Sequence, residues 1–341
     1  MSSLLLCVWA CAQRPPVAEA IGAVQEVVFD RYTPLSRNEE IARRTLTPLT
    51  FQHGQAMLAA TRQQFLEQPI DLTKEKFTLY VPDGAPPKEG YGLLVFIAPW
   101  SEPTRPQLWR LPLSRHGLIF VSAENSGNDV KVLDRRLPLA LLAYENVRAR
   151  FPLNPNRIYI GGLSGGSRAA EITALAYPDV FRGALLNAGS DPIGGEAGIY
   201  LPPAELFRKF REIKLVYVTG DGDERNLRDD EISRASMREW CVFGIEIRKA
   251  RKLGHEPLDQ PSFDQALDAL ERPATINPGE RERCNERVQQ ELASKLAAAR
   301  AAISRGDARG ARAQIKEIDA HYGGLAAPMI VDLDERLTKS G

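Results

Sequence analysis

The residues of this chain best suited to covalent chemistry begin with Ser164, which has glycines close on both sides. The run Gly162-Leu163-Ser164-Gly165-Gly166 matches the G-x-S-x-G pattern of a nucleophile elbow, a sharp turn between a strand and a helix. Glycines suit such a turn because a side chain there would collide with the crossing backbone. A β-branched and aromatic segment precedes the run, and helix-forming residues follow it. The pattern therefore predicts a nucleophilic Ser164 hydroxyl that points away from a sheet.

Two other interpretations of these glycines remain open. They could form a tight loop between a strand and a helix that carries no chemistry, or a phosphate-binding loop of the Rossmann kind. The second fits less well, because residues 161–166 do not give G-x-G-x-x-G and the run lies in mid-chain. The order of strand, glycines and helix favours the elbow.

A serine nucleophile needs a general base, and His255 is the candidate. It lies in Leu253-Gly254-His255-Glu256-Pro257, directly after a predicted strand at 243–249 and downstream of Ser164. Two of the other histidines fall in predicted helical segments and one precedes a strand, at the wrong end of a sheet: His53, His321 and His116. A purely structural role for His255 is the alternative.

The base in turn needs a carboxylate that orients it, and an acidic run follows the predicted strand at 214–219. The run reads Gly220-Asp221-Gly222-Asp223-Glu224. We favour Asp223, because Gly222 lets the chain turn so that Asp223 can point back across the strand ends. Asp221 is the alternative acid, and a solvated acidic turn without a catalytic role also remains open.

Two backbone amides are expected to face the oxyanion that forms when a serine attacks a carbonyl group. The first is the amide of Gly165, at the start of the helix after Ser164. The second should come from the loop after the predicted strand at 92–98, which reads Ala98-Pro99-Trp100-Ser101. Because Pro99 has no amide hydrogen, the donor is expected at Trp100 or Ser101, and we favour Trp100. A role for Trp100 as a core aromatic residue is the alternative.

Alternating strands and helices have to position these residues. Strands are predicted at 23–31, 76–81, 92–98, 117–123, 157–160, 183–187, 214–219 and 243–249, with helices at 137–150, from 165 to about 177, and at 228–241, broken helices over 38–65 and a short helix at 109–115. This order predicts an α/β domain over 23–275, with a mostly parallel sheet and helices on both faces. Over 278–341, three helices at 281–305, 307–322 and 326–337 form an appendage that should pack on this domain.

The composition excludes several classes of partner. Among 341 residues, Lys and Arg number 44 and Asp and Glu number 44, so neither nucleic acid nor an anionic membrane surface is indicated. Residues 1–12 resemble a secretory signal that ends at Ala10-Cys11-Ala12, or a lipoprotein signal with a lipid on Cys11, and are too short to span a bilayer. Such a signal predicts a secreted or periplasmic protein with a disulfide between Cys241 and Cys284; a cytoplasmic protein is the alternative.

Taken together, these motifs resemble the α/β-hydrolase superfamily, and within it esterases similar to polyhydroxybutyrate depolymerases and feruloyl esterases. The resemblance covers about Phe77 to Pro257 and includes residues 117–128, which end in Ser-Ala-Glu-Asn-Ser-Gly-Asn. It implies Ser164 as nucleophile, Asp223 by its spacing from Gly220, His255 as base, and the amides of Gly165 and Trp100 as oxyanion donors. Where the family usually has His-Gly before the oxyanion residue, this chain has Ala98-Pro99.

These observations predict an α/β-hydrolase fold with a C-terminal helical appendage and a serine-dependent carboxylic ester hydrolase activity. The expected partner is a small or polymeric ester, and the mechanism needs no metal or organic cofactor. A serine exopeptidase with the same triad, and a non-catalytic binding protein on the same scaffold, are the alternatives.

Overall fold

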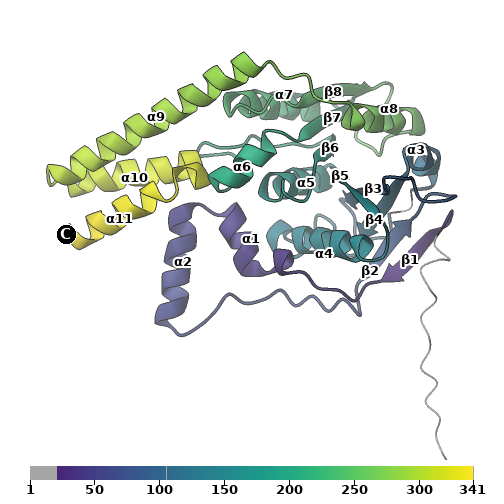
Figure 1. Cartoon of the computed structure of the whole chain (residues 1–341), viewed down its shortest axis with the longest axis horizontal. Helices are drawn as coiled ribbons and strands as arrows, with labels where there is room; N and C mark the ends of the chain where they lie inside the picture. Colours follow the sequence, from purple (N-terminus) through teal and green to yellow (C-terminus); the bar gives the residue numbers. More distant parts are fainter. Residues whose placement is uncertain (1–20, 105, 341) are drawn as a thin grey trace, which may run out of the picture.

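The computed structural model describes residues 21–104 and 106–340, and within them eight strands form a single sheet (Figure 1). The strands lie in the order β1-β2-β4-β3-β5-β6-β7-β8. Their bounds are β1 (Val24–Val28), β2 (Lys76–Tyr80), β3 (Tyr91–Ile97), β4 (Leu118–Ala123), β5 (Leu153–Leu163), β6 (Gly183–Asn187), β7 (Lys214–Gly220) and β8 (Ile245–Ala250). β2 is antiparallel to its neighbours β1 and β4, and from β4 to β8 adjacent strands are parallel. The predicted signal segment, with Cys11, lies outside the described residues.

The central strands are buried on both faces, which explains their nearly unbroken apolar sequences. In β3, Leu93 and Val95 belong to the core on one face of the sheet, whereas Leu94 and Phe96 belong to the core on the other. This alternation is the two-residue period of a strand. The mostly parallel sheet with helices on both faces is therefore confirmed.

Helices cover the two faces unequally. On one face lie α4 (Leu137–Arg148), α5 (Gly165–Ala176) and α7 (Glu224–Glu239), and on the other α3 (Arg110–Arg115) and α8 (Gln260–Glu271). Two further helices, α1 (Asn38–Thr45) and α2 (Pro48–Ala60), form the predicted broken pair before β2. Within residues 21–104 and 106–340, no helix is long and apolar enough to cross a bilayer.

Two helices were not predicted, and one begins earlier than expected. α6 (Ala204–Phe210) is short and follows a proline-containing loop, whereas α8 has apolar residues at helical spacing, Phe263, Leu267 and Leu270, which are a signal for a helix. α7 begins at Glu224 instead of residue 228, because the side chain of Asp223 caps it by accepting a hydrogen bond from the Asn226 amide at 3.3 Å. The earlier start brings the first turn of α7 to the end of the sheet where β7 finishes.

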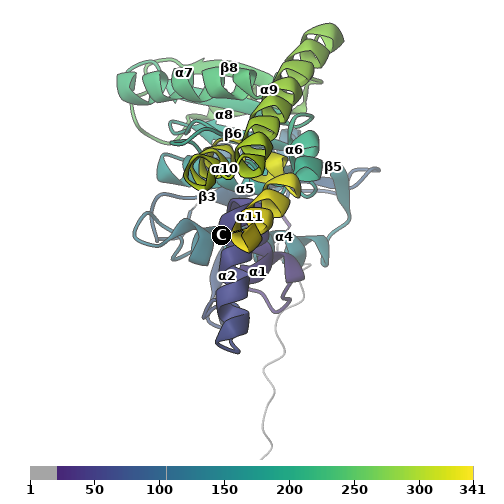
Figure 2. The ribbon, with the colours of Figure 1, turned by 90° about the vertical axis from the view of Figure 1, so that its left-hand side faces the viewer.

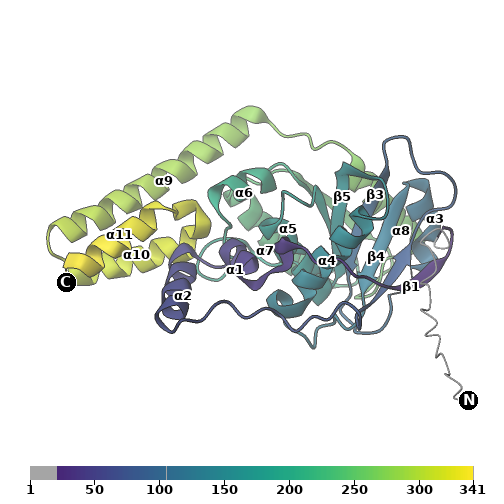
Figure 3. The same cartoon turned by 60° about the horizontal axis from the view of Figure 1, so that its bottom comes forward.

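The C-terminal appendage consists of α9 (Pro278–Ser304), α10 (Ala308–Tyr322) and α11 (Met329–Ser340). These helices extend from one end of the sheet-containing part, and α11 lies beside α2 (Figures 2 and 3). The apolar stripe of the appendage is continuous with the core on the α4–α5 face of the sheet. The expectation that these helices pack on the α/β domain is confirmed.

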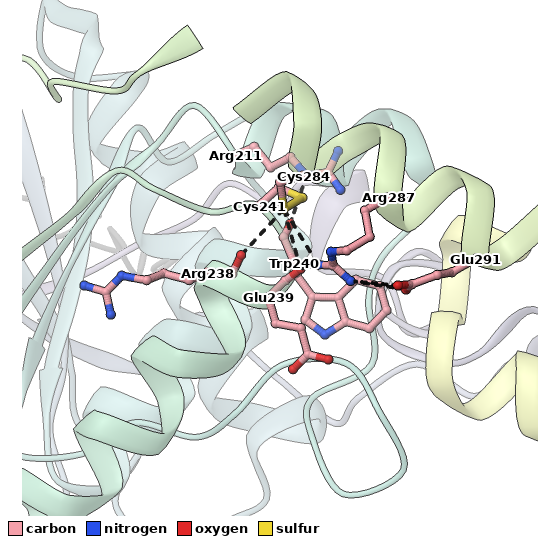
Figure 4. The surroundings of a disulfide bond; sticks show 8 residues. All are labelled: Arg211, Arg238, Glu239, Trp240, Cys241, Cys284, Arg287 and Glu291. Carbon is pink, nitrogen blue, oxygen red and sulfur yellow. Dashed lines mark hydrogen bonds and ion pairs between the residues drawn. A yellow bond between two sulfur atoms is a disulfide. The ribbon is translucent and has the colours of Figure 1, made fainter. Parts of the chain in front are cut away.

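The predicted disulfide between Cys241 and Cys284 is present and joins the residue after Trp240 to the first turns of α9 (Figure 4). Cys241 is fully buried. Next to the disulfide, the Arg287 guanidinium donates a hydrogen bond to the carbonyl of Glu239 at 2.5 Å. The covalent bond and this contact anchor α9 to the end of α7.

Candidate active site

The turn between β5 and α5 has the geometry of the predicted elbow. Ser164 has φ +57° and ψ −123°, a strained conformation for a residue with a side chain. The turn is tight, since a Cβ atom on Gly162 would overlap the backbone of Gly166, and one on Gly166 would overlap the carbonyl of Ile97. The Ser164 amide donates to the carbonyl of Asn187 on the neighbouring β6 at 2.8 Å. These contacts hold the serine at the carboxyl end of the sheet.

The structure brings the His255 ring between Ser164 and Asp223. The Nε2 atom of His255 lies 2.9 Å from Oγ of Ser164, and its Nδ1 atom lies 2.6 Å from Oδ2 of Asp223. The three side chains come from the loops after β5, β7 and β8, whose carboxyl ends meet at one edge of the sheet. The His255 side chain is 46% exposed and that of Asp223 is 7% exposed. This arrangement can transfer a proton from the serine to the imidazole while the carboxylate holds the ring.

Asp223 is held by a residue that the sequence did not single out. Asn226, buried in the first turn of α7, donates from Nδ2 to both carboxylate oxygens, at 3.1 and 2.9 Å. Burial raises the pKa of Asp223, but the hydrogen bonds from His255 and Asn226 outweigh this effect and leave the pKa below its usual value. The carboxylate is therefore ionised at neutral pH.

The alternative acid, Asp221, is engaged elsewhere. Its Oδ1 accepts a hydrogen bond from the amide of Lys252 at 2.8 Å, which ties the loop after β7 to the loop after β8. The remaining histidines bind acidic residues or pack on an aromatic ring: His53 with Asp334, His116 with Glu271, and His321 with Trp240. His116 lies at the amino end of β4, as its place in the sequence predicts.

The loop after β3, expected to carry the second oxyanion donor, is fastened to the segment after β4. The amide of Asn128 donates to the carbonyl of Pro99 at 3.0 Å, and the Ser101 hydroxyl donates to Asp129 at 2.9 Å. The amide of Asn125 donates to the carbonyl of Ser101 at 2.8 Å. Asn125 and Asn128 lie in the segment 117–128 described above. Trp100 is half-buried and packs against the core on the α3–α8 face.

A cavity of about 610 Å³ opens beside the three side chains. Its far wall is one face of α7, which presents Arg225, Asp229 and Ile232 at helical spacing. Arg168 also lines the cavity and forms ion pairs with Asp229 of α7 and with Asp191 of the loop after β6. The cavity therefore has a largely polar, charged lining.

A buried polar network, which the sequence did not reveal, supports this wall from behind. Asp230 accepts hydrogen bonds from Ser190 and Thr219, both at 2.6 Å. Glu171 accepts from the amide of Asp191 at 2.7 Å and from the Ser233 hydroxyl at 3.1 Å. Burial raises the pKa of both carboxyl groups, and that of Glu171 is raised well above its usual value.

The sheet order, the elbow after β5 and the chain order of serine, acid and histidine together define the fold. The chain has an α/β-hydrolase fold. No protein-family model matches the chain. Poly(3-hydroxyalkanoate) depolymerase C from Paucimonas lemoignei is 42% identical to it over 45 residues, which are 13% of this chain and 11% of the depolymerase. The match therefore spans only a small part of this curated relative.

Several solved structures of esterases are similar to the chain. A thermophilic esterase from Thermogutta terrifontis, Est2, has 16% identity and a TM-score of 0.43, over 59% of this chain and 87% of the esterase. Est1E from Butyrivibrio proteoclasticus has 16% identity and a TM-score of 0.42, over 60% and 96% of the two chains. A ferulic acid esterase has 18% identity and a TM-score of 0.42, over 61% and 94%.

Proposed function

We propose that the protein is a serine hydrolase that cleaves carboxylic esters, with Ser164 as nucleophile, His255 as general base and Asp223 as the orienting acid. The observation that carries this proposal is the position of the His255 ring, within hydrogen-bond distance of Oγ of Ser164 on one side and of the Asp223 carboxylate on the other. The strained elbow supports it, because such strain is typical of residues that take part in chemistry.

In the proposed reaction, Oγ of Ser164 attacks the ester carbonyl carbon and its proton passes to Nε2 of His255. The carbonyl electron pair moves to oxygen, and the amides of Gly165 and Trp100 stabilise the resulting oxyanion. Collapse of this intermediate expels the alcohol, which takes the proton from His255, and leaves an acyl group on Ser164. Water, activated by His255, then releases the acid and restores the serine.

The experiment that tests this proposal is an assay with p-nitrophenyl esters of graded acyl length, beside oligomers of 3-hydroxybutyrate and aminoacyl-anilides. We expect ester hydrolysis by the wild type. Because the curated relative is named a poly(3-hydroxyalkanoate) depolymerase, the oligomers test whether a polyester is the substrate. Cleavage of the anilides without cleavage of esters would favour the exopeptidase, and no cleavage would favour a binding protein.

The matched control is Ser164→Ala, which should reduce hydrolysis by at least about 10³-fold and leave the melting temperature nearly unchanged. The small effect on stability is expected because the substitution removes one half-buried hydroxyl from a turn that its backbone contacts maintain. A variant that keeps most of the activity would point to a different nucleophile.

We also propose an oxidising compartment, either outside the cell or in the periplasm. The Cys241–Cys284 disulfide supports this location, since disulfides are rare in reducing compartments. Alkylation of the protein isolated without reductant, followed by mass spectrometry, tests it. Two free thiols on the isolated protein would favour the cytoplasmic alternative.

A further inference from the structure

We infer that Arg136 is a positioning residue for the oxyanion hole, acting through the loop after β3 and through Asn128. This inference rests on the proposed function, because it assumes that the amides of Gly165 and Trp100 face an oxyanion. Its evidence comes from a feature that the triad does not explain: a buried arginine without an acidic partner.

Arg136 is only 4% exposed, and among the described residues no carboxylate lies within ion-pair distance of it. Its Nε atom has no hydrogen-bond partner in the same set of residues. Burial lowers the pKa of Arg136 to about 10, so the group is still charged at neutral pH. The adjacent Arg135 differs, because its guanidinium is paired with the carboxylate of Glu75 at 2.6 Å.

The backbone at Arg136 is also unusual. The residue has a helical backbone and ends a π-helical turn over Val132–Arg136 that continues directly into α4. π-Helical turns occur often at functional sites. A charge that is buried without an ion pair indicates a role other than stability.

The contacts of Arg136 lead to both proposed oxyanion donors. Its Nη2 donates to the carbonyl of Ala98 at 2.9 Å, two residues before Trp100. Its Nη1 donates to Oδ1 of Asn128 at 3.2 Å, and a Cβ atom on Gly165 would overlap this same oxygen. The Asn128 side chain thus contacts Gly165, the first donor residue. The backbone amide of Asn128 donates to the carbonyl of Pro99, which precedes Trp100, the second donor residue.

One guanidinium therefore connects the end of β3 with the elbow and can fix the separation of the two amides. Both hydrogen-bond acceptors of Arg136 are neutral oxygens, and the acidic group that acts on its charge, Asp129, lies beyond ion-pair distance. A fixed cation behind the donors favours the negative charge that develops on the carbonyl oxygen. The role of Arg136 is to arrange and polarise the donors, without contact with the substrate.

Asn128→Asp separates this role from a purely structural one. The new carboxylate has the same shape as the amide and pairs with Arg136, so the melting temperature should stay the same or rise. It also places a negative charge against Gly165 and neutralises Arg136, so kcat for p-nitrophenyl acetate should fall by about 10²-fold or more, the loss seen when an oxyanion donor is removed. KM should change by less than about threefold, because the effect acts on the transition state.

Three further variants complete the experiment. Asn156→Asp adds the same charge at an exposed position near the amino end of β5 and should keep the wild-type kcat. Arg136→Met should lower kcat at a similar KM, and Arg136→Lys should restore part of the loss. The affinity for phenylboronic acid, which forms a tetrahedral adduct with a reactive serine, should fall in parallel with kcat.

The inference is overturned if Asn128→Asp is folded and keeps kcat within about threefold of the wild type. This result stands even if Arg136→Met does not fold. Activity of the wild type distinguishes failure of this inference from failure of the proposed function. If the wild type and the Asn128→Asp variant are both active, only the role of Arg136 is overturned. A folded wild type without esterase activity overturns the proposed function, and this inference with it.

Discussion

The side chain of Asp223 makes two contacts with different roles. Its carboxylate receives the hydrogen bond from Nδ1 of His255, and it also caps α7 through the amide of Asn226. The cap fixes the carboxylate at the positive end of a helix, which favours its ionised form. The same bonds therefore keep the acid charged and aim it at the histidine.

Asp223→Asn should reduce kcat by about 10⁴-fold, the loss seen when the carboxylate of a catalytic triad becomes an amide. The substitution removes the acceptor that selects the tautomer of His255 with Nε2 free to take the serine proton. Steady-state kinetics with p-nitrophenyl acetate measure the effect.

Asp221→Asn is the matched control, because it changes the same group two residues away. Its carboxylate binds the amide of Lys252, so a loss of at most about tenfold is expected from a loosened loop. If the two variants exchanged phenotypes, Asp221 would be the acid and the contact between Asp223 and His255 would have no catalytic role.

Glu171→Gln should remove a pH dependence of stability. The raised pKa of buried Glu171 means that, above the ordinary value of 4.5, the unfolded state loses its proton before the native state does. The native state then binds more protons, so the free energy of unfolding falls as pH rises, by at most about 1.4 kcal/mol per pH unit. Glutamine keeps the shape of the side chain without this titration.

Urea unfolding of the wild type and of Glu171→Gln at several values between pH 4.5 and pH 8 measures this effect. The variant should gain stability relative to the wild type as pH rises. Glu282→Gln, at an exposed position, controls for the loss of a charge. A constant difference across the range would mean that Glu171 is ionised in the native protein.

At the scale of single residues, the sequence predicted Ser164, Asp223 and His255 because their order along the chain reflects the chemistry. It could not predict Asn226 or Arg136. Asn226 matters because α7 begins four residues earlier than expected, and Arg136 because it contacts a loop 38 residues away in sequence. Both depend on where elements end in space, for which a single sequence has no local signal.

At the scale of elements, the buried strands were the most predictable feature. β6 has the predicted bounds, 183–187, because a strand buried on both faces has a nearly unbroken apolar sequence. α8 was missed, although its capping residue Asp259 and Pro261 in its first turn are typical of a helix start. Its apolar residues also have helical spacing and pack on the sheet, so the sequence did contain a signal for this helix.

The disulfide is the covalent link between α7 and α9, and its reduction should destabilise the protein. It closes a loop of 43 residues, for which the chain-entropy model gives about 3–4 kcal/mol. Urea unfolding of the oxidised protein and of the protein kept in dithiothreitol measures the difference. A Cys241→Ala/Cys284→Ala variant, insensitive to dithiothreitol, is the control. A difference below about 1 kcal/mol would mean that packing alone fixes α9.

At the scale of the whole molecule, the C-terminal helices support the loop that follows β6. The amide of Gly324 donates to the carbonyl of Leu201 at 2.7 Å, and the amide of Gly195 donates to the carbonyl of His321 at 3.0 Å. Residues 190–192 of the same loop line the cavity. The appendage is therefore connected to a wall of the candidate site.

Gly324→Val should destabilise the protein by about 2 kcal/mol or more, because a side chain there overlaps the backbone of Pro202 and Pro203. KM should rise as well if the loop shifts. Gly54→Ala is the control, since nothing lies within 4 Å of a Cβ atom at this helical position and alanine favours helices. A Gly324→Val variant with the stability of the wild type would mean that the appendage does not pack closely on this loop.

The central claim, that Ser164 is an activated nucleophile, is tested most directly by reaction with a fluorophosphonate followed by mass spectrometry of the digested protein. We expect one adduct, on the peptide that contains Ser164, and its loss in Ser164→Ala. His255→Ala should also slow labelling strongly, because the base takes the serine proton. An intact, folded protein that takes no label, or a label on another serine, would contradict the account.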